Sequence, residues 1–213
     1  MNITRHTIYQ WLINCHHIFT AQQDYLTQLD REIGDADHGL NMQRGFNYVV
    51  EKLPDVANKD IGTILRTVGM TLLSKVGGAS GPLFGTFFLK AAQVAQNKEI
   101  LTLNEFYDVL KAGSDGLIAR GRAELGDKTI CDVLIPVLHD FQLALDKHEN
   151  SPALFQCLAD TAEHAAHDTT PLIAKKGRAS YLHERSCGHQ DPGATSTSYI
   201  FKALAQTMEN CHD

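Results

Sequence analysis

At 213 residues, with 43% hydrophobic and 21% charged residues, the chain has globular composition and enough length for one substantial core. The formal net charge is −6 and no long run of lysine or arginine occurs, which argues against direct nucleic-acid binding. The N-terminus lacks a basic segment leading into an apolar run, and no apolar stretch approaches the roughly 20 residues of a membrane span. We therefore expect neither a signal peptide nor a membrane segment.

The five cysteines are odd in number and form no Cys-x-x-Cys pair, so we expect neither a disulfide framework nor a zinc site. We interpret them as small buried hydrophobic residues in the reducing cytoplasm. They are Cys15, Cys131, Cys157, Cys187 and Cys211.

Apolar residues follow helical periodicity along most of the chain. Apolar residues at intervals of three and four predict one long helix from about Thr4 to Ile33. Helix-start signals at Asp60 and at Ser151-Pro152 support two later boundaries. The further predicted helices are at about 40–53, 60–76, 83–97, 104–120, 129–147, 152–170 and 194–210. The predicted fold class is all-α, a single domain over residues 1–213 built from antiparallel helices with mostly short loops.

The predicted connections are of two kinds that alternate along the chain. The plain polar connectors are 54–60, 98–103 and 148–151. The connections rich in Gly, Asp, Ser, Arg and His are 34–39, 77–82, 121–128 and 171–193. Alternate connections of an up-and-down array lie at the same end, so the four unusual loops should meet at one end of the bundle. This places Asp35, Ser80, Lys128 and Asp191 near one another.

The first unusual loop indicates a metal site. Asp35 and Asp37 lie two residues apart between glycines, shortly after Asp30 at the predicted helix end. Mg²⁺ prefers carboxylate oxygens and often takes its remaining ligands from phosphate. A calcium-binding EF-hand loop is not favoured, because its twelfth position would be Phe46 where a glutamate is needed. Three carboxylates exceed what one phosphate-bound Mg²⁺ usually needs, so we consider two ions.

The other three loops could hold phosphate. Gly77-Gly-Ala-Ser-Gly-Pro82 precedes a predicted helix, whose free N–H groups favour an anion, although a glycine-rich turn between closely packed helices is the alternative. Residues 121–129 fail as a P-loop because Asp127 interrupts the required pattern, and Lys128 could either contact phosphate or be solvated. Arg178, in the long last loop, could pair with phosphate or form a surface salt bridge.

His38 adjoins the carboxylates, and we favour a hydrogen-bonding role for it over a nucleophilic or phosphorylated one. Together, the residues indicate an Mg²⁺ and phosphate binder on a helical scaffold, suited to phosphoryl transfer.

Five motifs in this order resemble the nucleotide-binding L subunit of bacterial dihydroxyacetone kinase over nearly the whole chain. They are Gly34-Asp-Ala-Asp-His-Gly39, Gly77-Gly-Ala-Ser-Gly-Pro-Leu-Phe-Gly85, Gly126-Asp-Lys-Thr129, Gly177-Arg-Ala-Ser-Tyr181 and Gly188-His-Gln-Asp-Pro-Gly-Ala194. The resemblance implies a barrel of about eight antiparallel helices. It implies that two Mg²⁺ ions are held by Asp30, Asp35 and Asp37. The implied nucleotide contacts are His38, Gly39, Leu40, Asn41, Ala79, Ser80, Gly121, Ile130, Arg178, Asp191, Pro192 and Gly193.

The same resemblance implies a cytoplasmic phosphotransferase that keeps ADP as a bound coenzyme. A phosphohistidine protein of the phosphoenolpyruvate-dependent phosphotransferase system would rephosphorylate the ADP in place. A separate partner subunit would hold dihydroxyacetone and receive the phosphoryl group. A homodimer is also implied. Two alternatives stay open, namely an ATP-consuming kinase subunit and an additional regulatory role through a transcription factor.

Overall fold

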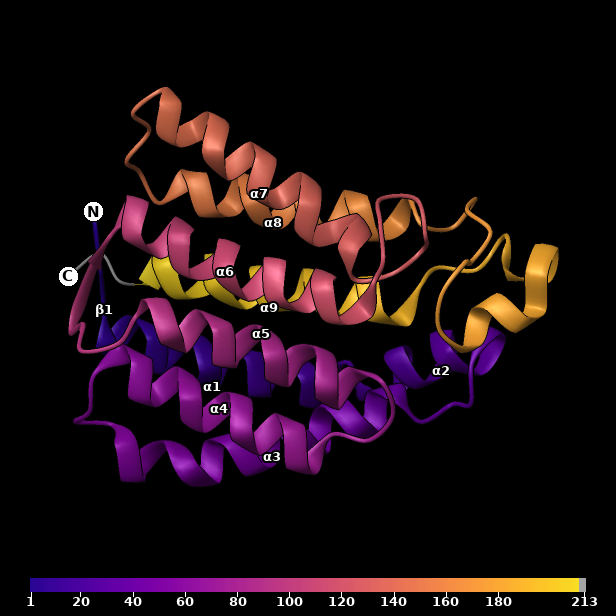
Figure 1. The fold of residues 1–213 in the computed structure, drawn as a ribbon, viewed down its shortest axis with the longest axis horizontal. Coiled ribbons are helices and arrows are strands. Elements are labelled where there is room, and N and C mark those ends of the chain that lie inside the picture. Colours follow the sequence, from indigo (N-terminus) through magenta and orange to yellow (C-terminus); the bar gives the residue numbers. More distant parts are fainter. Residues whose placement is uncertain (211–213) are drawn as a thin grey trace.

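The computed structural model describes residues 1–210, which fold almost entirely into helices (Figure 1). The α-helices are α1 (Arg5–Ala21), α2 (Gln23–Ile33), α3 (His38–Val56), α4 (Ile61–Lys75), α5 (Ser80–Val94), α6 (Leu103–Gly121), α7 (Cys131–Asp146), α8 (Ala153–His167) and α9 (Pro192–Asn210). The remaining elements are the strands β1 (Asn2–Thr4) and β2 (Ile100–Thr102) and the 3₁₀ helix η1 (Arg178–Ser186). The predicted all-α class is confirmed.

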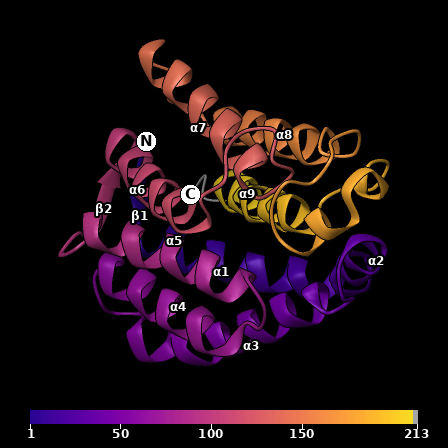
Figure 2. The ribbon, with the colours of Figure 1, turned by 45° about the vertical axis from the view of Figure 1, so that its right-hand side comes forward.

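Eight of the helices in residues 1–210 form a closed ring. Going round it, α1 contacts α3, followed by α4, α5, α6, α7, α8 and α9, and α9 returns to α1 (Figures 1 and 2). The indole of Trp11 in α1 donates a hydrogen bond of 2.9 Å to the Ile200 carbonyl of α9, which ties the first and last helices together inside the core. The barrel of about eight helices implied by the resemblance is therefore present.

The prediction of one long helix from Thr4 to Ile33 is wrong. The chain leaves helical geometry at Gln22, which has φ −105° and ψ 9°, and α2 then turns across one end of the ring to contact α3, α9 and η1. The apolar spacing continues through this break because Leu26 and Ile33 are also buried, so periodicity alone did not reveal it. The other predicted helices match the observed ones to within three residues at each end.

The two strands lie at the opposite end of the ring from α2, beside the N-terminus (Figure 1). They pair antiparallel, with Ile3 opposite Leu101, and each is too short to show an alternating pattern in the sequence. Within residues 1–210, no helix is both long enough and apolar enough to cross a membrane.

The expectation that the cysteines are buried holds for only part of the set. Cys15 and Cys131 are buried, but Cys157 and Cys187 are exposed, and Cys211 lies outside the described residues. Cys187 follows η1 in the long loop, where its thiol lies 3.3 Å from the Pro171 carbonyl. The sequence does not predict which cysteines are buried, because a single cysteine forms no periodic apolar pattern.

Candidate functional site

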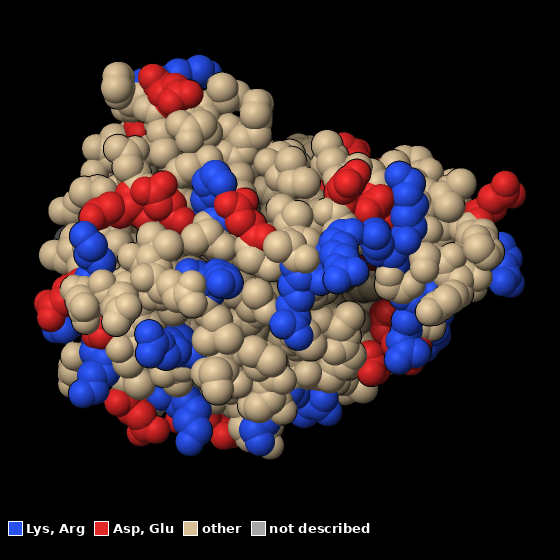
Figure 3. Space-filling model, viewed as in Figure 1, with Lys and Arg blue, Asp and Glu red and all other residues tan. Residues whose placement is uncertain are grey.

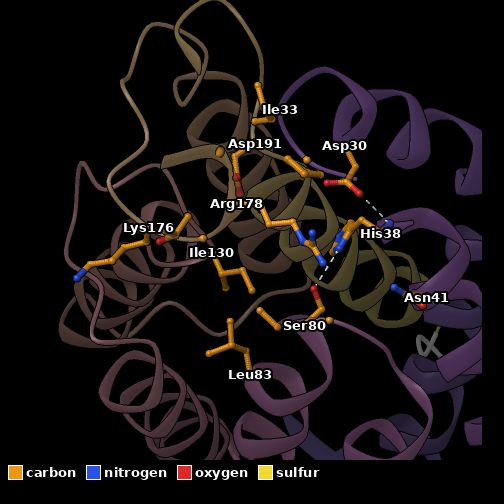
Figure 4. Close-up of a pocket in the computed structure, with 18 of the residues that line it drawn as sticks. Asp30, Ile33, His38, Asn41, Ser80, Leu83, Ile130, Lys176, Arg178 and Asp191 are labelled. Atoms are coloured by element: carbon orange, nitrogen blue, oxygen red, sulfur yellow. Dashed lines mark hydrogen bonds between the residues drawn. The ribbon is translucent and has the colours of Figure 1, made fainter. Parts of the chain in front are cut away.

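The four unusual loops meet at the end of the ring that carries α2 and η1, and together they line one cavity of about 400 Å³ (Figures 1 and 4). Short loops between antiparallel helices cause this, because every second connection returns to the same end. Figure 3 shows lysine and arginine side chains gathered around a hollow at this end, with acidic side chains beside it. The basic residues that line the cavity are Arg120, Lys128, Lys176 and Arg178.

One wall of the cavity is acidic. Ligand atoms of Asp30, Asp35 and Asp37 all lie within 4.8 Å of one another, at the end of α2 and in the loop before α3. Asp30 is buried, Asp37 is half-buried and Asp35 is exposed. A glycine is required at position 34, because an added Cβ would lie 1.9 Å from an Asp30 carboxylate oxygen. Converging carboxylate oxygens are the donor set that suits Mg²⁺, so these residues fit a divalent cation.

Asp30 also holds the start of α3 in place. One of its carboxylate oxygens accepts hydrogen bonds from the backbone N–H groups of Asp37, at 2.9 Å, and His38, at 3.1 Å. These are N–H groups of a helix start, which would otherwise lack partners in this buried position. The Asp30 carboxylate therefore belongs to the acidic wall and also stabilises the N-terminus of α3.

The imidazole of His38 is buried and engages a hydroxyl through each ring nitrogen. Nδ1 lies 3.1 Å from the Ser80 hydroxyl, and Nε2 lies 3.0 Å from the Ser196 hydroxyl. Burial lowers the pKa of His38 below its usual value, although the nearby Asp30 and Asp37 carboxylates oppose this shift. A neutral imidazole held at both nitrogens fits the hydrogen-bonding role that we favoured from the sequence.

The wall opposite the carboxylates is the start of α5. Gly77, Gly78, Ala79 and Ser80 line the cavity here, and no side chain caps the helix N-terminus. Gly78 has φ +63°, which favours glycine, and a Cβ on Gly77 would lie 2.8 Å from the Asn41 amide oxygen. Backbone N–H groups at a helix start, together with the Ser80 hydroxyl, can bind a phosphate.

A third part of the cavity is apolar. Leu83 and Ile130 face each other below the carboxylates in Figure 4, and Pro82 and Pro192 complete the lining. Lys176 extends away from the acidic wall on the far side of Ile130 (Figure 4). An apolar slot beside a phosphate-binding wall suits a flat base, since such ligands bury most of their surface against hydrophobic side chains.

Arg178 reaches across the cavity toward the acidic wall. Its guanidinium lies 2.8 Å from a carboxylate oxygen of Asp35, and both side chains are partly exposed to solvent. The salt bridge that we considered as the alternative role for Arg178 is therefore present. Its partner is one of the three candidate metal ligands, which places this arginine where a cation and a phosphate would meet.

Lys128 is buried, so the solvated alternative is wrong, and the residue lines the cavity. Its ammonium group donates hydrogen bonds to backbone carbonyls in the long last loop, and burial lowers its pKa while the nearby Asp191 carboxylate opposes this shift. Burial raises the pKa of Asp191 to about 7, against the effects of the Ala194 N–H and of Lys128. Asp191 caps the start of α9, with one oxygen 2.7 Å from the Ala194 nitrogen.

The structure places most of the residues implied as nucleotide contacts on the cavity wall. Gly39 and Leu40 are the exceptions, because they do not line it. Gly39 lies where α3 meets α2, and an added Cβ would lie 2.0 Å from the Gln23 carbonyl oxygen, whereas Leu40 is 49% exposed. Leu83 and Lys176 also line the cavity but were not predicted as site residues. In the sequence, Leu83 is an ordinary apolar residue of a predicted helix. The cavity-lining residues among those implied are His38, Asn41, Ala79, Ser80, Gly121, Ile130, Arg178, Asp191, Pro192 and Gly193.

Fold and site together define an all-α domain able to hold a divalent cation and a phosphate group in one cavity. The DAK2 domain model matches residues 32–206 of the chain. The chain is 56% identical, over 96% of its length and 98% of the relative's, to the Escherichia coli K12 PEP-dependent dihydroxyacetone kinase ADP-binding subunit DhaL. It is 37% identical, over 97% of its length and 99% of the relative's, to the Lactococcus lactis PTS-dependent dihydroxyacetone kinase ADP-binding subunit DhaL.

A solved structure extends the comparison to the fold. The crystal structure of the dihydroxyacetone kinase from C. freundii in complex with AMP-PNP and Mg²⁺ matches 93% of this chain with a TM-score of 0.71 and 25% identity. The chain spans about a third of the length of that solved chain, 33%. The chain therefore belongs to the DAK2 family, among the L subunits of bacterial dihydroxyacetone kinases, and is a kinase subunit.

Proposed function

We propose that this chain is the ADP-binding subunit of a phosphoenolpyruvate-dependent dihydroxyacetone kinase. It holds Mg-ADP as a coenzyme and receives a phosphoryl group from a phosphohistidine protein of the phosphotransferase system. It then passes this group to dihydroxyacetone on a partner subunit, giving dihydroxyacetone phosphate. The names of the Escherichia coli and Lactococcus lactis relatives, which match this chain over nearly its whole length, support the proposal.

The observation that carries the proposal is the link that His38 makes between two walls of the cavity. Its backbone N–H lies 3.1 Å from the Asp30 carboxylate, and its ring lies 3.1 Å from the Ser80 hydroxyl at the start of α5. A candidate metal wall and a candidate phosphate wall are therefore held at a fixed separation by one buried side chain. Metal-bound phosphates need both kinds of partner at once.

We propose a role for each group of residues that lines the cavity. Asp30, Asp35 and Asp37 would hold up to two Mg²⁺ ions, which neutralise phosphate charge when bound. The α5 N-terminus with Ser80 would bind phosphate oxygens, and Arg178 would pair with a terminal phosphate. These groups supply positioning and charge stabilisation, which is most of what phosphoryl transfer asks of a protein.

The remaining lining would orient the nucleotide. Leu83 and Ile130 would enclose the base, and the turn at Asp191, Pro192 and Gly193 would close the floor beneath it. The isoleucine at position 130 would give the base an apolar contact. The phosphate donor and the ketone-binding subunit must reach the same phosphate in turn, so we infer that each forms a complex at the mouth of the cavity. We also infer that this chain takes part in both complexes as a homodimer.

One experiment separates this proposal from the ATP-consuming alternative. The purified protein is combined with a dihydroxyacetone-binding subunit and supplied with either ATP or phosphoenolpyruvate plus the phosphotransferase proteins. We expect product only with the second donor, and ADP that stays with the protein through gel filtration. Turnover with ATP alone and rapid nucleotide exchange would instead establish the ATP-dependent kinase. Partner capture that changes between ADP and ATP, with a transcription factor as the captured protein, would support the regulatory role.

A further inference from the structure

Lys128 is a buried cation whose hydrogen-bonding capacity is fully used by the backbone. Its ammonium group lies 2.7 Å from the Ser186 carbonyl oxygen, 3.0 Å from that of Leu172 and 3.4 Å from that of Thr170. An ammonium group has three donors and no acceptor, so these three carbonyls match its capacity. The side chain is 1% exposed, which excludes the solvated role.

Two of these carbonyls belong to Leu172 and Ser186, the residues on either side of the loop 173–185. A single ammonium group therefore holds the two ends of this loop together, and we call this closure the neck of the loop. The Ser186 hydroxyl reinforces the neck, since it accepts a hydrogen bond from the Ala174 N–H at 2.9 Å and donates one to the His183 carbonyl at 2.6 Å.

The loop that is closed in this way carries part of the cavity wall. Lys176, Gly177, Arg178 and Ala179 line the cavity, and Arg178 is the residue that reaches Asp35. Beyond its neck, the loop packs on α2 through a small apolar cluster, made by Ile33 with Ala174, Ala179 and Leu182. The neck and this small cluster therefore both help to place the Arg178 guanidinium, together with the hydrogen bond of 3.0 Å from the Lys175 N–H to the Asp127 carbonyl.

We propose that Lys128 is a positioning residue that acts through Arg178, by closing the neck of the 173–185 loop. The inference rests on the proposed function, in which Arg178 pairs with a nucleotide phosphate. Because three carbonyls already occupy the Lys128 donors, Lys128 supports nucleotide binding by holding the loop, although it lines the cavity, and does not exchange these bonds for phosphate. Its contribution should therefore disappear when Arg178 is absent.

The test combines a binding measurement with a measurement of the loop itself. Lys128→Met and Ser186→Ala are each made in the wild-type and in an Arg178→Met background, and Mg-ADP dissociation constants are measured by calorimetry. Limited trypsin digestion reports on the loop, which contains Lys175, Lys176, Arg178 and Arg185. Lys52→Met serves as the control, since Lys52 is an exposed lysine toward the other end of α3.

We expect Lys128→Met to weaken Mg-ADP binding about 10- to 100-fold, the range for losing hydrogen bonds to a charged group, and Ser186→Ala to weaken it about 3- to 10-fold. Both variants should be cut in the 173–185 loop faster than wild type, and Lys52→Met should not. In the Arg178→Met background, either change should weaken binding by less than about twofold, because coupled sites are not additive.

Three results would overturn the proposal. The first is an unchanged cutting rate and affinity in both variants. The second is an undiminished loss of affinity in the Arg178→Met background, which would mean that Lys128 contacts the nucleotide directly. The third, if Lys128→Met does not fold, is a Ser186→Ala protein that behaves as wild type. Failure of wild-type protein to bind Mg-ADP would refute the proposed function, while the digestion would still test the closure of the loop.

Discussion

The guanidinium of Arg178 lies 2.8 Å from a carboxylate oxygen of Asp35, so a candidate phosphate ligand is paired with a candidate metal ligand. The Arg178 side chain is 65% exposed and that of Asp35 is 34% exposed, which makes this a weak, solvent-screened pair. A cation bound by Asp35 would compete with the guanidinium for the same oxygen. Metal binding at Asp35 would therefore free the Arg178 donors for a phosphate.

This competition gives the first prediction. Arg178→Met should tighten Mn²⁺ binding in the absence of nucleotide by roughly two- to fivefold, the equivalent of an exposed ion pair, and should weaken Mg-ADP binding. Calorimetry with and without ADP measures both changes. Arg185→Met is the matched control, because Arg185 is an exposed arginine of the same 3₁₀ helix. An Arg178→Met protein with weaker Mn²⁺ binding would contradict the competition.

The second prediction separates two carboxylates of the acidic wall. Asp30→Ala should lower the free energy of unfolding by about 1–2 kcal/mol, because it removes the oxygen that accepts two backbone hydrogen bonds at the start of α3. Asp37→Ala removes no such bonds, so its stability should be unchanged, or slightly higher because repulsion between the carboxylates is relieved. Both variants should lose Mg-ADP binding. Urea unfolding without Mg²⁺ checks the difference, and equal stability of the two variants would refute the capping role of Asp30.

The helices and the meeting of the loops could be predicted because both follow from local rules. Regular apolar spacing, as at Val133, Val137 and Phe141, marks a helix whose buried face is fixed by its own sequence. The cap at Asp60 is equally local, since its side chain accepts the Thr63 N–H at 3.1 Å. Helix number and short loops then bring alternate connections to one end without further information.

Features that depend on distant partners could not be predicted in this way. Lys128 is buried because carbonyls 42 to 58 residues later in the chain surround its ammonium group. The sequence next to Lys128 contains no pattern that predicts these contacts. The break at Gln22 depends on where α2 can pack, and Leu83 has the same apolar character whether it faces the core or the cavity. Tertiary contacts decide these three cases, and local patterns do not record such contacts.

The third prediction follows from the raised pKa of Asp191. Burial raises it from 3.8 to about 7, so the folded state favours the protonated carboxyl. This contribution to stability is complete below about pH 4 and is lost as the pH rises through 7. Asp191→Asn keeps a neutral acceptor for the Ala194 N–H and should abolish this part of the pH dependence. Its stability relative to wild type should rise between pH 4 and 8 by up to about 4 kcal/mol, at 1.36 kcal/mol per unit of pKa shift.

Urea unfolding of the two proteins at pH 4.5, 6 and 8, without nucleotide or Mg²⁺, measures this difference. Subtracting the free energy of unfolding of the wild type from that of the variant at each pH removes the contributions of groups that titrate equally in both proteins. A stability difference that stays constant over this range would show that Asp191 titrates at its ordinary pKa in the folded protein.

The fourth prediction concerns Gly39, which the family resemblance implies as a nucleotide contact and which the structure places between α3 and α2. An added Cβ would lie 2.0 Å from the Gln23 carbonyl oxygen and 2.4 Å from the Thr27 hydroxyl, so Gly39→Ala must push two helices apart. We expect it to lower the free energy of unfolding by about 1–3 kcal/mol, as overpacking does. The folded fraction should bind Mg-ADP with nearly wild-type affinity, because residue 39 does not line the cavity.

Gly121→Ala is the matched comparison, because Gly121 does line the cavity but has room for a methyl group. Its added Cβ would make an ordinary contact of 3.4 Å with Leu83, so stability should change by less than about 0.5 kcal/mol. Mg-ADP affinity should fall instead, since the methyl group narrows the slot beside Leu83. If Gly39→Ala lost nucleotide binding at unchanged stability, Gly39 would have to contact the nucleotide directly, and its role between α2 and α3 would be secondary.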